Sequence, residues 1–323
     1  MNDKIPCLNK DKEAGQLINF DNDLSFEVEK LSGLTYDQIF EIQTKQHVLA
    51  TSKKAGDTLL LEDFRKAKIG VVVVCRMDSN RLPSKAILKI GKYTSIERCI
   101  KSVLRFPHVH TTVLATSTNN EDAVLKDHCY RNDVKFYRGD SLDVMKRILE
   151  ASNIYELDIL SRVTGDMPFA SAEIYEFMLK NHFETGVDYS KPGNSSVGTS
   201  MAVFTKKSLE KLKTYFSAAE YSEYLPYYFT NNPEVVDTRI VELPEEYIRG
   251  YRLTLDFEDD LIMLDKIETY LEEKMAEANL NLIFNYLDNN PEVSEINSHH
   301  QLKYTSNQEL IDKLNKHTRI LNT

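Results

Sequence analysis

The feature that most constrains the fold of this chain is a regular alternation of strand-like and helix-like segments that begins near residue 68. Residues 69–75 form an uninterrupted apolar run rich in valine, which is typical of a strand buried on both faces of a parallel sheet. Residues 95–106 place apolar side chains at three- and four-residue steps after a serine, which predicts a helix. The alternation continues with a strand at 112–115, a helix at 121–131, a strand at 134–137, a helix at 141–152 and a strand at 159–163. This order predicts right-handed crossovers and an α/β, doubly wound, mostly parallel Rossmann-like sheet with helices on both faces.

The chain divides into two regions of different character. Residues 1–67 are rich in lysine, aspartate and asparagine and have only patchy helical spacing, so we predict a small N-terminal appendage there and a main domain over residues 68–323. The second half of the main domain is more mixed. Its predicted elements are helices at 172–183, 207–215 and 259–278, a short strand at 201–204, an edge-like segment at 236–243 and a helix stop at 289–291.

Charge and composition exclude several classes of protein. Fifty acidic residues against forty basic ones give a formal charge of −10, which opposes binding to a nucleic-acid backbone. The longest apolar run is far shorter than the roughly 20 residues of a membrane helix, and the first 20 residues lack a signal-peptide core, so we expect a cytoplasmic protein without a membrane partner. The four cysteines show no zinc or disulfide spacing. We expect His299 and His300 to lie in a solvated loop.

A basic loop follows the first predicted strand of the main domain. Arg76, Arg81 and Lys85 fall within ten residues, at the carboxyl edge of the sheet where ligands bind in doubly wound folds. Arginine and lysine there can neutralise a triphosphate and its leaving pyrophosphate. The loop contains neither a dinucleotide-binding fingerprint nor a P-loop. On spacing alone, a solvated basic loop explains these residues equally well.

The loop resembles the signature ARxGSxRLPGK of the cytidylyltransferases that activate acidic sugars and other polysaccharide precursors. The resemblance is strongest to the branch named for spore coat polysaccharide biosynthesis, related to the CMP-KDO and CMP-sialic acid synthetases. Matching positions are held by Arg76, Ser79, Arg81, Leu82, Pro83 and Lys85. Asp78 and Ser84 replace the usual glycines. Further segments that resemble family motifs follow in the family's order at 115–119, 137–147, 162–168, 251–259 and 290–297, so the resemblance spans about residues 68 to 310.

The resemblance implies a nucleotidyltransferase of GT-A-like architecture that uses CTP and Mg²⁺. It implies that Asp166 and Asp256, each at the end of a strand-like run, are the metal ligands, and hard carboxylate oxygens are what Mg²⁺ prefers. The residues expected to bind the nucleotide are Arg76, Ser79, Arg81, Lys85, Thr116, Ser117 and Arg162. Of these, Arg76, Arg81 and Lys85 are expected to act in catalysis together with Asp166. The expected reaction transfers CMP to an acidic sugar or a phosphorylated small molecule and releases pyrophosphate.

Three points stay open at this level. Tyr224 stands where the related branch often has histidine, and the tyrosines of residues 221–228 fit a sugar pocket, core packing or a homodimer interface equally well. A glycosyltransferase-like protein, or a nucleotide-sugar-binding protein without turnover, would share the fold. Residues 47–68 resemble the opening of the antifreeze-like (SAF) domain of sialic-acid synthases, and a packing or linker segment is the alternative interpretation.

Overall fold

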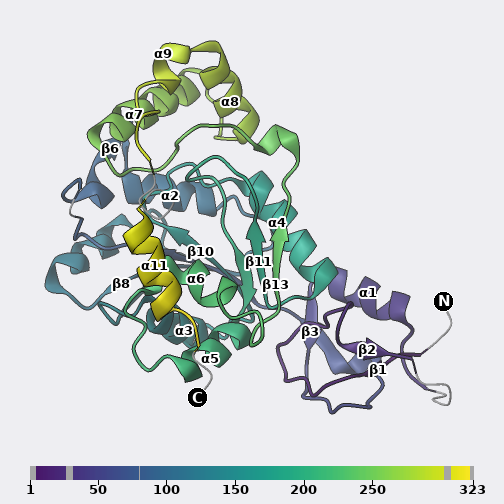
Figure 1. Ribbon diagram of the computed structural model, residues 1–323. Helices are drawn as coiled ribbons and strands as arrows, with labels where there is room; N and C mark the ends of the chain where they lie inside the picture. The colour runs from purple at the N-terminus through teal and green to yellow at the C-terminus, as the bar shows by residue number, and fades with distance from the viewer. Residues whose placement is uncertain (1–4, 27–31, 80, 302–306, 321–323) are drawn as a thin grey trace.

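A seven-stranded sheet forms the centre of the molecule, with the strand order β13-β11-β12-β10-β5-β8-β9 (Figure 1). The structure is a computed structural model that describes residues 5–26, 32–79, 81–301 and 307–320. The strands of this sheet are β5 (Ile69–Val74), β8 (Thr111–Ser117), β9 (Lys135–Gly139), β10 (Ile159–Thr164), β11 (Tyr189–Pro192), β12 (Val203–Thr205) and β13 (Thr238–Val241). Strands β10, β5, β8 and β9 run parallel, and β12 is antiparallel to both of its neighbours. The predicted mostly parallel, doubly wound sheet is confirmed.

Helices cover both faces of the sheet, because successive side chains of a strand point to opposite sides. In β5, Ile69, Val71 and Val73 belong to one core cluster, while Val72 and Val74 belong to another. The first cluster includes residues of α2 (Ser95–Val103), α4 (Ala172–Thr185), α7 (Glu258–Glu273) and α8 (Leu280–Asn289). The second includes residues of α3 (Val144–Ile154), α5 (Lys206–Tyr215) and α6 (Leu225–Thr230).

Short elements complete the main domain. They are the hairpin of β6 (Lys89–Ile90) and β7 (Tyr93–Thr94), the 3₁₀ segments η2 (Lys85–Ile87), η3 (Asn120–His128), η4 (Ser222–Tyr224) and η5 (Glu245–Tyr247), and the helices α9 (Pro291–Ser294) and α11 (Gln308–His317). The helix predicted at 121–131 is therefore the 3₁₀ segment η3. The helix predicted to reach residue 278 ends at Glu273, and Met275 just beyond it takes a left-handed φ of 51°, which an α-helix cannot continue through. No described helix is long and apolar enough to cross a bilayer.

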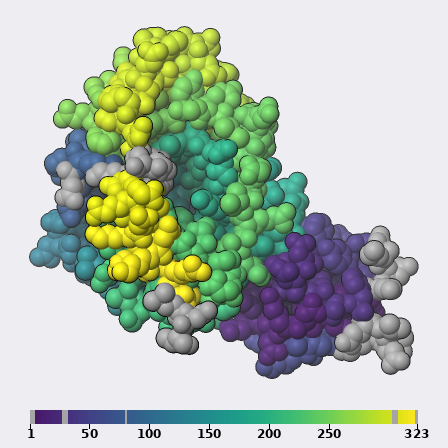
Figure 2. Space-filling view, viewed as in Figure 1, coloured from purple at the N-terminus to yellow at the C-terminus, as the bar shows by residue number. Residues whose placement is uncertain are grey.

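The N-terminal residues form a separate small unit beside the main domain (Figures 1 and 2). Its elements are β1 (Cys7–Leu8), β2 (Leu24–Ser25), α1 (Tyr36–Thr44), β3 (His47–Leu49), η1 (Leu61–Asp63) and β4 (Phe64–Lys66). The side chains of its own core are Leu8, Ile18, Ile39, Leu49, Leu59 and Phe64. The division predicted at residue 68 falls between β4 and β5.

Close polar contacts hold this unit against the main domain. The guanidinium of Arg65 binds both carboxylate oxygens of Asp158, at 2.6 and 2.8 Å. The buried side chain of Gln43 donates to the carbonyl oxygens of Ile18 and Phe183. Gly186 ends α4 with φ +70°, and a Cβ there would lie 1.7 Å from the carbonyl oxygen of Ile18. Glycine is thus required where the two parts meet.

Candidate active site

The basic loop leaves the carboxyl end of β5, where a buried acid holds it in place. Asp122, in η3, is 1% exposed. One of its carboxylate oxygens accepts from the backbone amide of Met77 at 2.6 Å, and the other accepts from the hydroxyl of Ser117 at the end of β8. The acid therefore fastens the loop to the neighbouring strand. Sequence reasoning missed Asp122, because an acid in the first turn of a predicted helix already has an ordinary explanation in the helix dipole.

Lys85 joins two carboxylates that are distant in the sequence. Its ammonium lies 2.7 Å from Oδ2 of Asp166, 2.8 Å from Oδ1 of Asp256 and 2.8 Å from the carbonyl oxygen of Leu255. Asp166 follows β10, and Asp256 precedes α7. Three oxygen atoms from these two segments therefore surround one cation.

Backbone contacts explain how the two segments meet. The amide of Leu255 and the hydroxyl of Thr254 both donate to the carbonyl oxygen of Asp166, at 2.9 and 3.1 Å. On the other side, the amide of Leu253 donates to Val197 at 2.7 Å. Gly198 permits that approach, because at its φ of +85° a Cβ would lie 2.4 Å from the carbonyl oxygen of Leu253.

Two arginines complete the charge network around Asp256. Arg81 binds Oδ1 of Asp256 at 2.7 Å, and Arg252 binds Oδ2 at 2.8 Å. Arg252 also binds Asp260 at 2.9 Å, and Asp260 accepts from the amides of Asp256 and Phe257. Asp260 thus caps α7, as an acid in a first helical turn is expected to do, and it also orients Arg252. The sequence motif contained Arg252, but sequence reasoning did not assign it to the site.

The protonation states follow from burial and neighbouring charge. Burial acts to raise the pKa of Asp166, but the Lys85 ammonium outweighs it through its charge and hydrogen bond, so the pKa lies below its ordinary value. Burial opposes the charge on Lys85, but Asp166 and Asp256 outweigh it, and the pKa of Lys85 is raised. Burial raises the pKa of the nearby Cys75 thiol to about 12. The Asp166 carboxylate and the Lys85 ammonium are therefore ionised at neutral pH, while this thiol is protonated and a poor nucleophile.

The residues around Lys85 fit a magnesium ion. Asp166 and Asp256 already converge on one positive charge, and hard oxygens such as theirs are the ligands that Mg²⁺ prefers. The side chain of Asp166 is 22% exposed and that of Lys85 17%, so solvent reaches the cluster.

The other predicted nucleotide-binding residues fall into two groups. Arg76 donates to the carbonyl oxygen of Ser141 at 3.1 Å, and its guanidinium lies 3.8 Å from the side-chain carboxylate of Glu223. The backbone carbonyl oxygen of Glu223 accepts a hydrogen bond from Arg162 at 2.8 Å. Arg76 and Arg162 therefore meet at Glu223, with Arg76 just beyond the end of β5 and Arg162 within the adjacent strand β10. The second group is Ser79, Thr116 and Ser117.

Thr116 and Ser117 lie inside the protein rather than on an open surface. Both are fully buried, and the Ser117 hydroxyl donates to Asp122 while it accepts from the amide of Asn119. The Ser117 side chain thus supports the end of β8. Ser79 lies half-buried in the basic loop.

A buried arginine that was not predicted as a site residue lies behind Arg76. Arg147 donates to the carbonyl oxygens of Asp140 and Ser141 and is fully buried. Burial, together with the positive charge of Arg76, lowers the pKa of Arg147. Two guanidinium groups thus share the oxygen of Ser141, a concentration of positive charge that favours an anion nearby.

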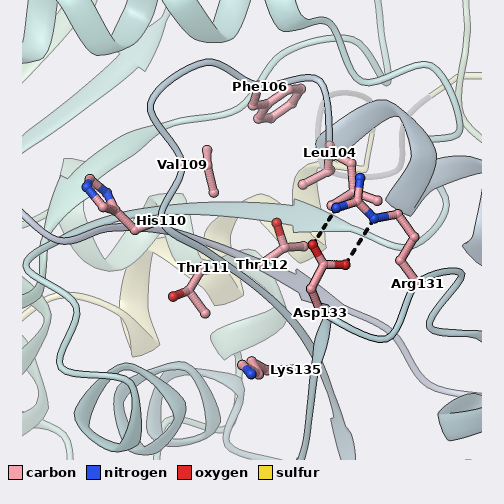
Figure 3. Close-up of a pocket in the computed structure, with 10 residues that line it drawn as sticks. Leu104, Phe106, Val109, His110, Thr111, Thr112, Arg131, Asp133 and Lys135 are labelled. Atoms are coloured by element: carbon pink, nitrogen blue, oxygen red, sulfur yellow. Dashed lines mark hydrogen bonds and ion pairs between the residues drawn. The ribbon is translucent and has the colours of Figure 1, made fainter.

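A cavity of about 200 Å³ lies at the opposite edge of the sheet, at the amino ends of β8 and β9. Figure 3 shows that Arg131 and Asp133 in its lining bind each other. Their charges therefore compensate each other within the pair. The length of the strands separates this cavity from Lys85, Asp166 and Asp256.

Comparisons with known proteins show which proteins this chain resembles. A family model described as cytidylyltransferase matches residues 71–311. An uncharacterized protein of Methanocaldococcus jannaschii is 30% identical over 237 residues, which cover 72% of this chain and 95% of that protein. The spore coat polysaccharide biosynthesis protein SpsF of Bacillus subtilis is 27% identical over 195 residues, covering 58% of this chain and 81% of SpsF.

A solved structure shares the fold of the main domain. The cytidylyltransferase from Leptospira borgpetersenii superposes with a TM-score of 0.65 and 26% identity, and the match covers 73% of this chain and 99% of that one. The family match begins at residue 71, so the N-terminal unit lies outside it. With three quarters of its length matched by the family model, this chain belongs to the cytidylyltransferase family and is a nucleotidyltransferase.

Proposed function

We propose that this protein transfers CMP from CTP to an acidic sugar or a phosphorylated small molecule, with magnesium as cofactor, in the synthesis of a surface glycan precursor. The observation that carries the proposal is the shared Lys85 ammonium, which lies within 2.8 Å of both Asp166 and Asp256. Ligands of doubly wound sheets bind at the carboxyl ends of the strands, and Mg²⁺ binds one or two carboxylates together with substrate phosphates. The position of Lys85 between two carboxylates at this edge therefore suits a metal-bound triphosphate. Similarity to SpsF, a polysaccharide biosynthesis protein, supports the acceptor class.

In the proposed reaction, an acceptor oxygen attacks the α-phosphorus of CTP. A bond from that oxygen to phosphorus forms, the bond to the β-phosphate oxygen breaks, and pyrophosphate leaves while the acceptor proton passes to solvent. Magnesium, when bound by Asp166 and Asp256, supplies charge that stabilises the triphosphate and the leaving group. No covalent enzyme intermediate is required, and the protonated thiol of Cys75 is unsuited to form one.

The basic residues then take the roles that their positions allow. Lys85 exchanges its bonds to the two carboxylates for bonds to phosphate oxygens, and Arg81, which is bound to Asp256 and 35% exposed, turns to the same phosphates. Arg76 and Arg162 border the site near Glu223. An anionic acceptor is favoured there, since guanidinium groups bind carboxylate and phosphate through paired hydrogen bonds.

A nucleotide-binding protein without turnover is the second candidate, and one observation favours it. Ser84, which stands where the family usually has glycine, takes a left-handed φ of 54° directly before Lys85. Strain at this position could place Lys85 away from its working geometry.

Pyrophosphate release distinguishes the two functions. The purified full-length protein is mixed with Mg²⁺, an acidic sugar or phosphorylated polyol, and CTP, ATP or GTP in turn. We expect CTP to support turnover far better than the purine nucleotides, because a pocket that fits a pyrimidine edge clashes with a purine or leaves polar groups unpaired. Equal rates with all three nucleotides would refute the CTP assignment, and CTP binding without release with every acceptor would favour the binding protein.

A further inference from the structure

Beside the proposed nucleotide site, three side chains with metal-binding chemistry converge at the start of α7. Asp259 belongs to the first turn of α7, and His299 and His300 come from the segment that follows α9. The Nε2 atoms of His300 and His299 lie 3.1 and 3.4 Å from the same carboxylate oxygen, Oδ2 of Asp259. One ligand atom from each of the three lies within 4.8 Å of the others. We call these three residues the histidine cluster.

Two of the three distances in the histidine cluster match those around a transition metal, and the ligand nitrogens of the two histidines lie within 4.8 Å of each other. Zinc binds imidazole nitrogen and carboxylate oxygen at about 2.0–2.1 Å in a tetrahedron, which places neighbouring ligand atoms about 3.3 Å apart. The observed separations of 3.1 and 3.4 Å lie on either side of that value. A small inward movement of side chains would therefore complete a three-ligand site, with water as the fourth ligand.

The surroundings of the cluster provide both access and support. The side chains of Asp259 and His299 are 40% and 61% exposed, so an ion and its water can enter from solvent. His300 is only 19% exposed, because its ring stacks on Phe257 with centroids 4.0 Å apart. His300 thus corrects the sequence-based expectation of a solvated loop: the segment is anchored by aromatic stacking and by its contact with α7.

We propose that Asp259, His299 and His300 bind a divalent transition-metal ion, for which Zn²⁺ is the probe. The ligand set separates this site from the Asp166–Asp256 pair, because imidazole suits zinc, copper and nickel whereas carboxylates alone suit magnesium. The proposal does not depend on the reaction that the protein catalyses.

Such an ion would clip the segment after α9 to the start of α7. The bound ion would hold His300 in place and, through the stacked His300 ring, Phe257. The guanidinium groups of Arg81 and Arg252 lie 5.3 and 5.6 Å from the centre of the Phe257 ring. Both arginines bind Asp256. A metal in the histidine cluster would therefore stabilise one wall of the nucleotide site as a structural ion.

Calorimetric titration of Zn²⁺ tests the proposal. The full chain is prepared without a histidine tag, stripped with a chelator, and titrated in excess Mg²⁺ to occupy carboxylate-only sites. We expect one zinc ion per chain and a rise in melting temperature with zinc, because an ion that binds only the folded state stabilises it. His299→Gln and His300→Gln should each weaken binding by more than about 10-fold, since loss of even an outer partner of a metal ligand costs 10- to 100-fold in affinity.

Two control variants make the result specific. His128 lies 3.2 Å from the Glu97 carboxylate, so His128→Gln removes a comparable imidazole–carboxylate pair and should leave zinc binding unchanged. Asp166→Asn should also leave it unchanged, whereas lost binding in this variant would place the zinc in the nucleotide site and overturn the proposal. His299→Gln removes an exposed side chain and should melt like the stripped wild type. Equal zinc binding by wild type, His299→Gln and His300→Gln, or none by the wild type, would assign the cluster to hydrogen bonding alone.

Discussion

Strand β10 has an acidic residue just beyond each of its ends, and the two acids are bound in different ways. Asp158, before the strand, receives two parallel bonds from Arg65 and one from the amide of Lys68. Asp166, after the strand, shares the ammonium of Lys85 with Asp256. The first arrangement is a closed pair of one cation and one carboxylate, and the second is a cation held in common by two carboxylates.

The difference separates a structural contact from a candidate binding site. The planar fork of Arg65 matches the carboxylate of Asp158 geometrically, so exchange for another partner would lose two bonds at once. Lysine is a point charge on a flexible stem, and a metal ion and phosphate oxygens can replace its contacts one for one. We therefore expect substitutions at the amino end to change stability and those at the carboxyl end to change turnover.

The largest effect is expected from the two shared carboxylates. Asp166→Asn and Asp256→Asn should each lower kcat by about 10²-fold or more, because an amide is a weaker magnesium ligand and leaves the triphosphate charge less compensated. The measurement is steady-state pyrophosphate release at saturating Mg²⁺. Asp158→Asn is the matched control at the other end of β10 and should keep kcat near the wild-type value. If Asp166→Asn behaved in the same way, the distinction between the two ends would be wrong.

Lys85 is expected to have the next largest effect. Lys85→Ala should lower kcat/KM for CTP by about 10- to 150-fold, which corresponds to one charge-assisted contact of roughly 1.5 to 3 kcal/mol. Lys85→Arg retains the charge but changes the shape, so a similar loss would show that the fit around the phosphates matters.

An exposed lysine near the other end of β10 controls for the loss of charge in this experiment. Lys68 forms an ion pair with Glu156, and both side chains are more than half exposed, so Lys68→Ala should change neither kinetics nor stability appreciably. Unchanged CTP kinetics in Lys85→Ala would favour the alternative interpretation, in which the basic loop is an ordinary solvated surface loop.

The pair at the amino end should affect stability rather than kinetics. Arg65→Ala should lower the free energy of unfolding by about 1 to 3 kcal/mol, since it leaves the largely buried carboxylate of Asp158 without its charged partner. Urea denaturation measures the change, and pyrophosphate release should show kcat close to that of the wild type. A large loss of kcat in a folded Arg65→Ala protein would mean that the N-terminal unit takes part in the reaction.

The smallest expected effect concerns the loop that carries Lys85. Ser84→Gly should stabilise the protein by about 1 kcal/mol, because a non-glycine residue in the left-handed region pays roughly 1 to 2 kcal/mol that glycine avoids. The measurement is a thermal melt, with Ser84→Ala as a control that keeps the Cβ and should show no gain. Destabilisation by glycine would indicate that the serine stiffens the loop more than it strains it.

Local sequence signals predicted most of the main-domain fold. The continuous apolar run of β5 predicted a strand buried on both faces, and both core clusters contain its side chains. Helix positions were predicted well where apolar spacing was regular, as in α2 and α4. The signal was weakest for η3, which is a 3₁₀ segment, and strand β11 (Tyr189–Pro192) was not predicted.

The candidate site was predicted in part for the same reason. Residues at the ends of predicted strands could be placed at one edge of the sheet, and Lys85, Arg81, Asp166 and Asp256 do lie together. The burial of Thr116 and Ser117, and the support from Asp122, depend on packing between neighbouring segments and left no local pattern to recognise.

The sequence by itself determined the fold class, the family and the residue types of the basic loop, because these depend on periodicity and on short contiguous motifs. Only the tertiary structure decided which charges share a partner. Lys85 and Asp256 are 171 positions apart, and Asp259 and His300 are 41 apart. Such contacts arise when packed helices and strands bring distant segments together, so the spacing of residues along the chain does not predict them.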